Sequence, residues 1–289
     1  MERELWPPLY HLLQQVARTF SQKYVQHQPW VLVAVMLWAA LHDRPVSWAC
    51  QKRHWGGTRL RPGRLPSANT LSRRLDGVGV GLFWRALADR VRGEGPPALA
   101  ALVDGKPLLV GGCSKDPDAR FGRAAGHVGK GYKLHAVWAG RAAPEAWEVT
   151  PLNGCEKAAA RRLVGQLGHG GYLLADGNYD ASRLYDAAWA AGYQLVAPTR
   201  RSRNPGGGHC YQSPHRRRSI ALLRSDFGRA LYRARAAIER AFGNATAFGG
   251  GLTAPPAWVR GLARVRTWTW AKLIINAARI RRIQDLRRA

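Results

Sequence analysis

The sequence predicts a mixed α/β fold preceded by an all-helical region, and three observations support this fold class. The hydrophobic pattern is helical up to about residue 92. The stretch Gly93–Pro97, rich in glycine and proline, is typical of a linker. After it, short apolar strands alternate with amphipathic helices, as they do in layered α/β domains. We therefore expect two domains, one over residues 1–95 and one over residues 96–289.

Helices are expected at three places before the linker. The segment Trp30–Leu41 has no polar face, so it should form a buried helix. Ser47 is of a residue type that caps helices, and we expect it to begin a second one that ends near His54. Ser67 is expected to cap a third helix, on which Leu71 and Leu75 lie one turn apart on the buried side.

On the third helix, Thr70, Arg73 and Arg74 would face outward. A short helix that presents such side chains beside a partner helix is the arrangement by which a helix-turn-helix enters the major groove. A solvent-exposed helix in a small bundle has the same pattern, so this alternative stays open. The pattern favours a DNA-binding region in which these three residues contact DNA.

The second domain is predicted to alternate strands with helices, and the order of its elements follows from the apolar runs. A polar stretch near its middle, Arg200–Arg218, is expected to be a loop. The arginine run at the end of that loop would follow phosphates or form only a solvated tether; it consists of Arg216, Arg217 and Arg218. The expected strands are Leu99–Val103, Gly131–Trp138, Ala146–Leu152, Tyr172–Ala175 and Leu195–Pro198, and the expected helices are Lys157–Leu167, Ser182–Ala191, about Phe227–Phe242 and about Trp258–Arg287.

The charge balance points to a polyanionic partner. The chain has 45 Lys and Arg residues against 18 Asp and Glu residues, a formal net charge of +27. Nucleic acid is the leading candidate for the partner and a membrane surface is the second. The longest apolar run, Trp30–Leu41, is too short to span a bilayer, and the start of the chain has no signal-peptide pattern. We expect a protein of the cytoplasm.

The cysteines are scattered without the spacing of a disulfide framework, which suits a reducing compartment. Cys50 with His54, and Cys210 with His215, have the residue types of zinc ligands. Neither pair has the second pair of ligands that a structural zinc site requires. We therefore expect free thiols. The four cysteines are Cys50, Cys113, Cys155 and Cys210.

Two aspartates occupy matching positions in the second domain. Asp104 and Asp176 each follow a predicted buried strand, and each is followed by glycine. Open α/β sheets place their ligands at the carboxyl ends of parallel strands, so neighbouring strands would let the two carboxylates share a metal ion. Asp-Gly is also the favoured hairpin turn. The repetition of the pattern after two buried strands favours the site.

A third acid lies on a predicted helix farther along the chain. Tyr232, Arg235 and Glu239 share one helix face, because spacings of three and four residues close a turn. Such a face offers a carboxylate to a metal ion while it presents Arg and Tyr to a phosphate. The alternative is a surface ion pair between Arg235 and Glu239, which contributes little to stability.

These acids resemble those of the DDE transposases of bacterial insertion sequences, in the group marked by Tyr-x2-Arg-x3-Glu around the last acid. Other segments are similar to that family's first acidic strand, its second strand and its Asp-x-x-Tyr-Asp motif around the second acid. The resemblance spans about Leu99 to Arg281. The matching segments are Val103-Asp104-Gly105, Gly131-Tyr132-Lys133-Leu134-His135 and Ala175-Asp176-Gly177-Asn178-Tyr179-Asp180.

The resemblance implies an RNase H-like mixed sheet flanked by helices. It also implies two divalent ions, Mg²⁺ or Mn²⁺, held by Asp104, Asp176 and Glu239. The expected reaction cuts double-stranded DNA at the terminal inverted repeats of the element and joins the freed 3′-OH to target DNA. Because two ends must be brought together, a homodimer is expected in the synaptic complex. Asp104 would bridge the two ions, with Asp176 holding one and Glu239 the other.

Further DNA contacts are expected around these acids. Tyr232 and Arg235 would lie near the reacting phosphate, and Lys106 would either neutralise phosphate or point to solvent. The family has a basic residue seven positions after the glutamate, where this chain has Thr246, and Arg240 is the candidate to replace it. The interval between the last two acids is too short for the large β insertion that some relatives carry.

Lys133 and His135 alternate with apolar residues on the second strand, so both are candidates to face the site; a structural role is favoured for His135. Tyr179 and Asp180 are expected to cap the helix that follows them. Two rival functions stay open. One rival to the transposase is a catalytically silent, domesticated DNA-binding protein. The other is a metal-dependent DNA nuclease that cuts without strand transfer.

Overall fold

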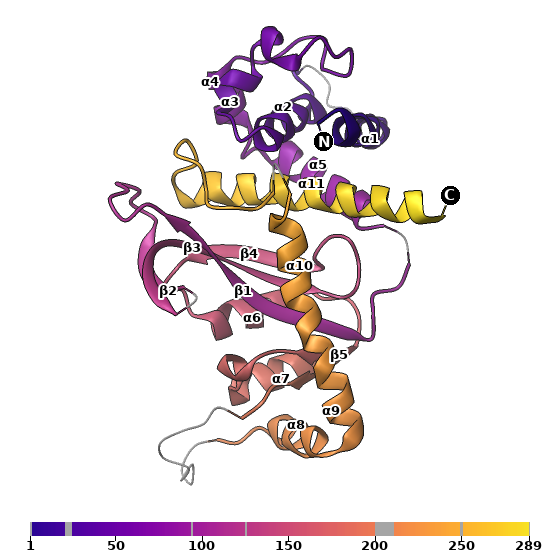
Figure 1. Cartoon of the computed structure of the whole chain (residues 1–289), viewed down its shortest axis with the longest axis vertical. Coiled ribbons are helices and arrows are strands. Elements are labelled where there is room, and N and C mark those ends of the chain that lie inside the picture. Colours follow the sequence, from indigo (N-terminus) through magenta and orange to yellow (C-terminus); the bar gives the residue numbers. More distant parts are fainter. Residues whose placement is uncertain are drawn as a thin grey trace. The chain divides into compact units, whose positions relative to one another are not determined.

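The computed structural model describes residues 2–20, 25–93, 95–124, 126–199, 211–248 and 251–288. The chain divides into two compact units (Figure 1), one formed by Met1–Glu94 with Asn244–Ala289 and the other by Gly95–Gly243. The first break adjoins the boundary expected from the sequence at residues 95 and 96. The C-terminal segment differs, because we expected it in the second domain and its contacts place it in the first unit.

The first unit is helical, as predicted. Helix α2 is buried almost throughout because α1, α5 and α11 all pack against it. This packing explains why its sequence lacks a polar face. The described helices of this unit are α1 (Glu2–Ala17), α2 (Pro29–Leu41), α3 (Val46–Ala49), the 3₁₀ turn η1 (Lys52–Trp55), α4 (Ala68–Arg74), α5 (Val78–Arg92) and α11 (Leu262–Arg288).

Two of the predicted helix starts can be compared with the structure. Ser67 caps α4 as expected, since its hydroxyl accepts a hydrogen bond from the backbone NH of Thr70 at 3.1 Å. The helix expected to begin at Ser47 is different: α3 begins after Pro45, has no side-chain cap and ends at Ala49. A proline fixes its own backbone in an extended turn, and here it takes the capping position.

The second unit is built on one mixed sheet. Its strands are β1 (Ala100–Val110), β2 (Arg120–Ala124), β3 (His127–Trp138), β4 (Ala146–Pro151), β5 (Gly171–Leu174) and β6 (Tyr193–Val196). Its helices are α6 (Glu156–Val164), η2 (Gly177–Tyr179), α7 (Ser182–Ala190), α8 (Pro214–Arg224), α9 (Asp226–Arg233), η3 (Ala234–Ala236) and the first part of α10 (Ala237–Thr246).

The strand order is β2-β3-β1-β5-β6, and β4 also pairs with β3. Strands β1 to β4 pair antiparallel, whereas β5 pairs parallel with both β1 and β6. The long strand β3 pairs with β2 through its first half and with β4 through its second half. An antiparallel half joined to a parallel half, with helices on the faces, confirms the RNase H-like mixed sheet expected from the sequence.

The register of β1 and β3 assigns side chains to the two faces of the sheet. Val103 and Val137 pair directly and belong to the core beneath α6 and α7. Asp104 pairs with Ala136, so its side chain is on the other face. On that face Phe242 of α10 packs edge-on against Trp138, with ring centroids 5.0 Å apart. The sheet therefore separates an apolar helical layer from the face that carries Asp104.

The structure corrects two sequence-based expectations. Strand β1 does not end at Val103 but continues through Asp104 to Val110, because β3 pairs with it along that whole length. Arg216, Arg217 and Arg218, expected in a loop, lie on helix α8. Ser213 caps that helix, because its hydroxyl accepts hydrogen bonds from the backbone NH groups of His215 and Arg216. The rest of the expected loop, residues 200–210, lies outside the described residues.

A substitution at Gly131 tests how closely the backbones of β1 and β3 must approach each other. A Cβ at this position would lie 2.3 Å from the backbone oxygen of Leu108. We expect Gly131→Ala to lower the free energy of unfolding by about 1–3 kcal/mol, since a backbone atom cannot move aside as a side chain can. Gly112→Ala is the matched control, because a Cβ there meets nothing within 4 Å. Equal stability of the two variants in urea unfolding would contradict the packing described.

Candidate active site

Asp104 and Asp176 come together because their strands pair in parallel. The register aligns Leu102 of β1 with Leu174 of β5, and each aspartate lies two residues farther along its chain. Asp176 caps the 3₁₀ turn η2, accepting a hydrogen bond from the NH of Asn178 at 2.8 Å. Both Asp-Gly pairs therefore lie outside hairpin turns, so the turn alternative is excluded at both positions.

The two carboxylates interact electrostatically. Burial raises the pKa of Asp104 to about 6; the NH of Gly105 opposes this shift and the charge of Asp176 adds to it. The pKa of Tyr179 is raised well above its usual value, mainly by burial and then by the charges of Asp104, Glu156 and Asp176. A desolvated acid beside a second acid is a site where a cation would be stabilised.

The third acid is connected to this pair through Arg235. One guanidinium nitrogen of Arg235 lies 3.7 Å from Asp104 Oδ2, and the other lies 4.0 Å from Glu239 Oε1. The Glu239 side chain is 74% exposed and is free to rotate. Tyr232 donates a hydrogen bond to the carbonyl of Ala175, the residue before Asp176, at 3.1 Å. The Tyr-x2-Arg-x3-Glu segment therefore touches both strands that carry the other acids.

The helix bearing this segment is not continuous. Helix α9 ends at Arg233, and the 3₁₀ turn η3 (Ala234–Ala236) separates it from α10. The sequence predicted one unbroken helix face, whereas the structure places Tyr232 on α9, Arg235 in the turn and Glu239 on α10. The tighter turn still leaves Arg235 within reach of Glu239.

The chemistry of the donors fits a hard divalent cation, although the carboxylates are not yet gathered around one point. Within the described residues, no three His, Cys, Asp or Glu side chains form a metal-binding group. Asp104 and Asp176 alone supply two carboxylates, the ligands that Mg²⁺ prefers. Arg235 stands between Asp104 and Glu239, and its Nε is buried without a hydrogen-bond partner among the described residues. A rotation of Glu239 and of Arg235 would be needed to complete a three-acid set.

Lys133 and His135 lie on the opposite face of the sheet from Asp104. Lys133 pairs with Pro107 across β1, is almost fully buried, and forms an ion pair of 2.5 Å with Glu156. His135 Nε2 is 3.0 Å from the hydroxyl of Thr150, and burial lowers the pKa of the imidazole to about 4. These contacts are structural.

Lys106 and Arg240 are placed differently. Lys106 pairs with Leu134 and therefore shares the face of Asp104; burial lowers the pKa of its amine. Arg240 is exposed on α10, next in sequence to Glu239. Of the basic residues predicted around the acids, Lys106 and Arg235 are the two that accompany Asp104 on its face of the sheet.

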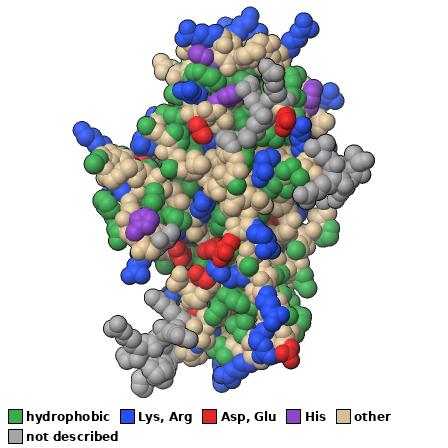
Figure 2. Space-filling model, viewed as in Figure 1, with side chains coloured by type: hydrophobic (Ala, Val, Ile, Leu, Met, Phe, Trp, Pro, Cys, Tyr) green, Lys and Arg blue, Asp and Glu red, His purple; other side chains and the backbone are tan. Residues whose placement is uncertain are grey.

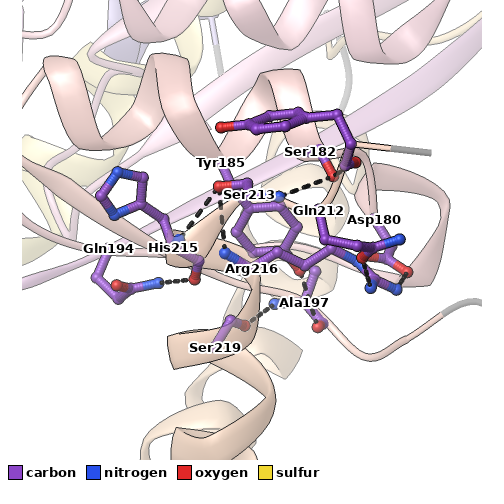
Figure 3. Close-up of polar contacts among 11 residues, drawn as sticks. Asp180, Ser182, Tyr185, Gln194, Ala197, Gln212, Ser213, His215, Arg216 and Ser219 are labelled. Carbon is purple, nitrogen blue, oxygen red and sulfur yellow. Dashed lines mark hydrogen bonds and ion pairs between the residues drawn. The ribbon is translucent and has the colours of Figure 1, made fainter. Parts of the chain in front are cut away.

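Sequence reasoning missed the contact that ties α8 to the loop of the second acid (Figure 3). Arg216 donates to both oxygens of Asp180, at 2.6 and 2.7 Å, and the Asp180 side chain is only 4% exposed. Ser213 donates a hydrogen bond to Asp186 of α7 at 2.5 Å. Asp180 thus anchors α8 instead of capping α7, which follows Ala181 and has no side-chain cap.

The other two arginines of the run are exposed. The guanidinium of Arg218 lies 4.8 Å from the ring centroid of Trp189. Arg217 is on the same helix and has its side chain in solvent. The three consecutive arginines therefore have different surroundings, because successive helix positions point in different directions.

In the first unit, α4 presents the predicted recognition residues. Leu71 is buried, Arg73 is exposed, and Thr70 and Arg74 are half-exposed. Cys50 is a free thiol whose pKa is raised to about 11 by burial. The other proposed zinc pair includes Cys210, which lies outside the described residues. Among the helices described, none is both long enough and apolar enough to cross a membrane.

Comparison with known families agrees with this geometry. The family described as "Transposase DDE domain" matches residues 95–275, which include all three acids. The chain belongs to this transposase DDE domain family.

A solved structure titled "Cryo-EM structure of piggyBac transposase synaptic complex with hairpin DNA (SNHP)" is 10% identical, with a TM-score of 0.33, and the match covers 77% of this chain and 51% of that chain. The chain thus spans about half the length of that transposase. No curated protein matches the chain.

The raised pKa of Asp104 has a consequence for stability. An acid whose pKa is higher in the folded chain than in the unfolded chain favours folding when protonated, so the fold is penalised above pH ~6 and not below pH ~4. We expect Asp104→Asn to raise the free energy of unfolding of the metal-free protein by about 2–3 kcal/mol at pH 8 and to change it little at pH 4. Thermal unfolding in EDTA measures this, with the exposed acid changed in Asp226→Asn as control.

The Arg216–Asp180 pair gives a second expectation. Removing the guanidinium breaks a two-point ion pair to a carboxylate that is only 4% exposed, so Arg216→Ala should lower the free energy of unfolding by about 3–5 kcal/mol. Arg217→Ala removes the same charge from the exposed neighbour and should change stability by less than about 0.5 kcal/mol. Similar losses in both variants, measured by denaturant unfolding, would refute the role given to Asp180.

Proposed function

We propose that the chain is a DNA transposase that cuts DNA at the ends of its element and transfers the freed 3′-OH to target DNA. The observation that carries this proposal is the parallel pairing of β1 and β5, which sets Asp104 beside Asp176 in a chain of the transposase DDE domain family. Glu239 is the third acid of the proposed set, and Arg235 connects it to Asp104.

The site residues have separate tasks in this proposal. Two divalent ions, Mg²⁺ or Mn²⁺, would activate the attacking water or 3′-OH and stabilise the leaving oxygen. Asp104, central to the set, would hold both ions, with Asp176 and Glu239 holding one each. The raised pKa of Asp104 supports this assignment, because burial and the charge of Asp176 outweigh the opposing charge of Arg235, so a further cation would stabilise the carboxylate.

Arg235 would change partners when DNA binds. In the metal-free chain its guanidinium is shared between Asp104 and Glu239. Its Nε, buried and without a partner among the described residues, is a donor that a phosphate oxygen would satisfy. The Tyr232 hydroxyl donates a hydrogen bond to the carbonyl of Ala175, and this contact would hold α9 against the end of β5.

DNA binding is assigned to polar and basic residues that the fold leaves exposed or half-exposed. Lys106 and Arg240 would contact DNA near the cut, with Arg217 and Arg218 on α8. In the first unit, Thr70, Arg73 and Arg74 of α4 would contact the terminal repeat. The net charge of +27 supports a polyanionic partner. Lys133 and Arg216 also carry positive charge, but their ion pairs with Glu156 and Asp180 favour structural roles.

Transposition joins two ends, so a homodimer is the proposed assembly of the synaptic complex. The proposed location is the bacterial cytoplasm, with the protein associated with the nucleoid. Among the alternatives, a silent DNA-binding protein is disfavoured because the three acids are all present, and a nuclease without strand transfer shares the same site.

Replacement of the acids tests the proposal. With a plasmid that carries the terminal repeats and with Mg²⁺, we expect the wild-type chain to cut the ends and join them to target DNA. Asp176→Asn should reduce cleavage by at least a thousandfold, since a metal ligand is lost, while DNA binding stays within about twofold. Asp226→Asn, at a fully exposed acid of α9, is the control and should cleave normally.

The same assay separates the rival functions. Cutting without joining would identify a nuclease, and binding without cutting would identify a silent DNA-binding protein. Loss of DNA binding in Asp176→Asn would speak against a metal role for that residue.

A further inference from the structure

Strands β2 and β3 form a two-stranded ribbon, residues 120–124 and 127–130, that the sequence did not reveal as a functional element. Its register pairs Phe121 with Lys130 and Arg123 with Val128. Directly paired residues share a face, so these four side chains lie together on one side of the ribbon. Phe121 is 61% exposed and Val128 is 70% exposed. The amine of Lys130 lies 5.9 Å from the centroid of the Phe121 ring.

On its other face the ribbon packs closely against the protein at two glycines, Gly122 and Gly129. A Cβ on Gly122 would lie 2.7 Å from the backbone oxygen of Leu152, and a Cβ on Gly129 would lie 2.8 Å from the Leu109 side chain. Glycine at both positions lets those neighbours approach closely. The face formed by Phe121, Arg123, Val128 and Lys130 is therefore the one on which the ribbon presents exposed apolar and basic side chains together. We call it the ribbon face.

The ribbon face continues the sheet face that carries Asp104. Asp104 of β1 pairs with Ala136 of β3, and Val110 of β1 pairs with Lys130 of β3. Along each strand an even number of residues separates the two pairs. Side chains on a strand alternate, so Asp104, Lys106 and Lys130 point to the same side. From Asp104 to Val110 the strand advances roughly 20 Å, which is about six base pairs of duplex at 3.4 Å each.

The chemistry of the ribbon face fits duplex DNA. On the ribbon face Arg123 and Lys130 are basic, Phe121 and Val128 are apolar, and none of the four residues is acidic. The major groove admits a two-stranded β-ribbon, and exposed apolar side chains can contact thymine methyl groups there while basic side chains reach the phosphates. In Figure 2, basic and hydrophobic side chains lie beside one another on the flank formed by β2 and β3.

We propose that the ribbon face binds duplex DNA about six base pairs from the scissile phosphate. This inference rests on the proposed function, since it places one DNA duplex across both the acids and the ribbon. A polyanion is favoured over a second copy of the chain, because a copy would set Arg123 and Lys130 against an equally basic surface. The Lys130 amine donates to the backbone oxygen of Ser114 and keeps its charge for a partner. The ribbon would thereby position DNA at the site without contacting the reacting atoms.

Binding in EDTA tests the ribbon independently of cleavage. The probe is a duplex that contains one terminal repeat and its flanking DNA. We expect Phe121→Ala/Arg123→Ala to bind at least tenfold more weakly. Arg123→Ala alone should reduce the log–log salt slope by about 0.9, the value for one phosphate contact. Arg161→Ala/Arg183→Ala is the control, because it removes exposed arginines from α6 and α7, which pack on the opposite face.

A photo-reactive phenylalanine analogue at position 121 locates the contact. We expect it to cross-link to DNA about six base pairs from the cleavage position, and the variants to keep the thermal stability of the wild-type protein. Wild-type affinity in both ribbon variants, cross-linking only between two protein copies, or a loss equal to that of the control would overturn the proposal. The two proposals fail separately: a chain that binds through the ribbon but never cleaves contradicts the proposed function alone, and one that cleaves normally without ribbon contacts contradicts the ribbon alone.

Discussion

The parallel pairing of β1 with β5 is the contact on which the rest of the site depends. It holds Asp104 and Asp176 at neighbouring positions, although 71 residues separate them between positions 104 and 176. The arrangement opposes stability in the metal-free chain, because burial and like charge both raise the pKa of Asp104. The fold tolerates this because the strands themselves are held by apolar side chains, such as Val103 and Leu173, in the core beneath α6 and α7. The packing of the sheet thus offsets the repulsion between the two carboxylates and keeps them in positions where a cation would be stabilised.

The third acid depends on a different kind of support. It lies outside the sheet, on α10, at the end of the helical segment that runs from α8 through α9. Two polar contacts attach α8 and α9 to residues on either side of the second acid. Arg216 binds Asp180 just after Asp176, and Tyr232 binds the carbonyl just before it. Glu239 itself is exposed and held only by the long contact with Arg235. Two acids are therefore preorganised, and the third is attached to a support that permits rotation. Under the proposed function, this division would let DNA enter the site before Glu239 rotates toward the reacting phosphate.

Much of this could be inferred from the sequence, because local patterns encode local structure. The apolar runs gave correct positions for α2 and for most strands of the second unit, and Ser67 caps α4 as expected. Strand β2 was missed, since its residues are glycine-rich and basic and become a strand only by pairing with β3. The helix α8 was missed because its arginines resemble a solvated loop when Asp180 and Trp189 are not known to be their neighbours. Long-range partners leave no periodic signal along the chain.

The sequence alone determined the residue types of the site, the repeated strand-Asp-Gly pattern and the strong positive charge, because composition and short-range spacing are properties of the chain itself. Tertiary structure alone decided which residues share a face. It placed Lys106 with Asp104 and sent Lys133 to the opposite side, through a strand register in which a shift by one residue reverses every side chain. It also placed the C-terminal helix α11 in the unit formed by the N-terminal helices, where α11 packs against the apolar helix α2. Pairing and burial join residues distant in sequence, and their free energy depends on the assembled fold.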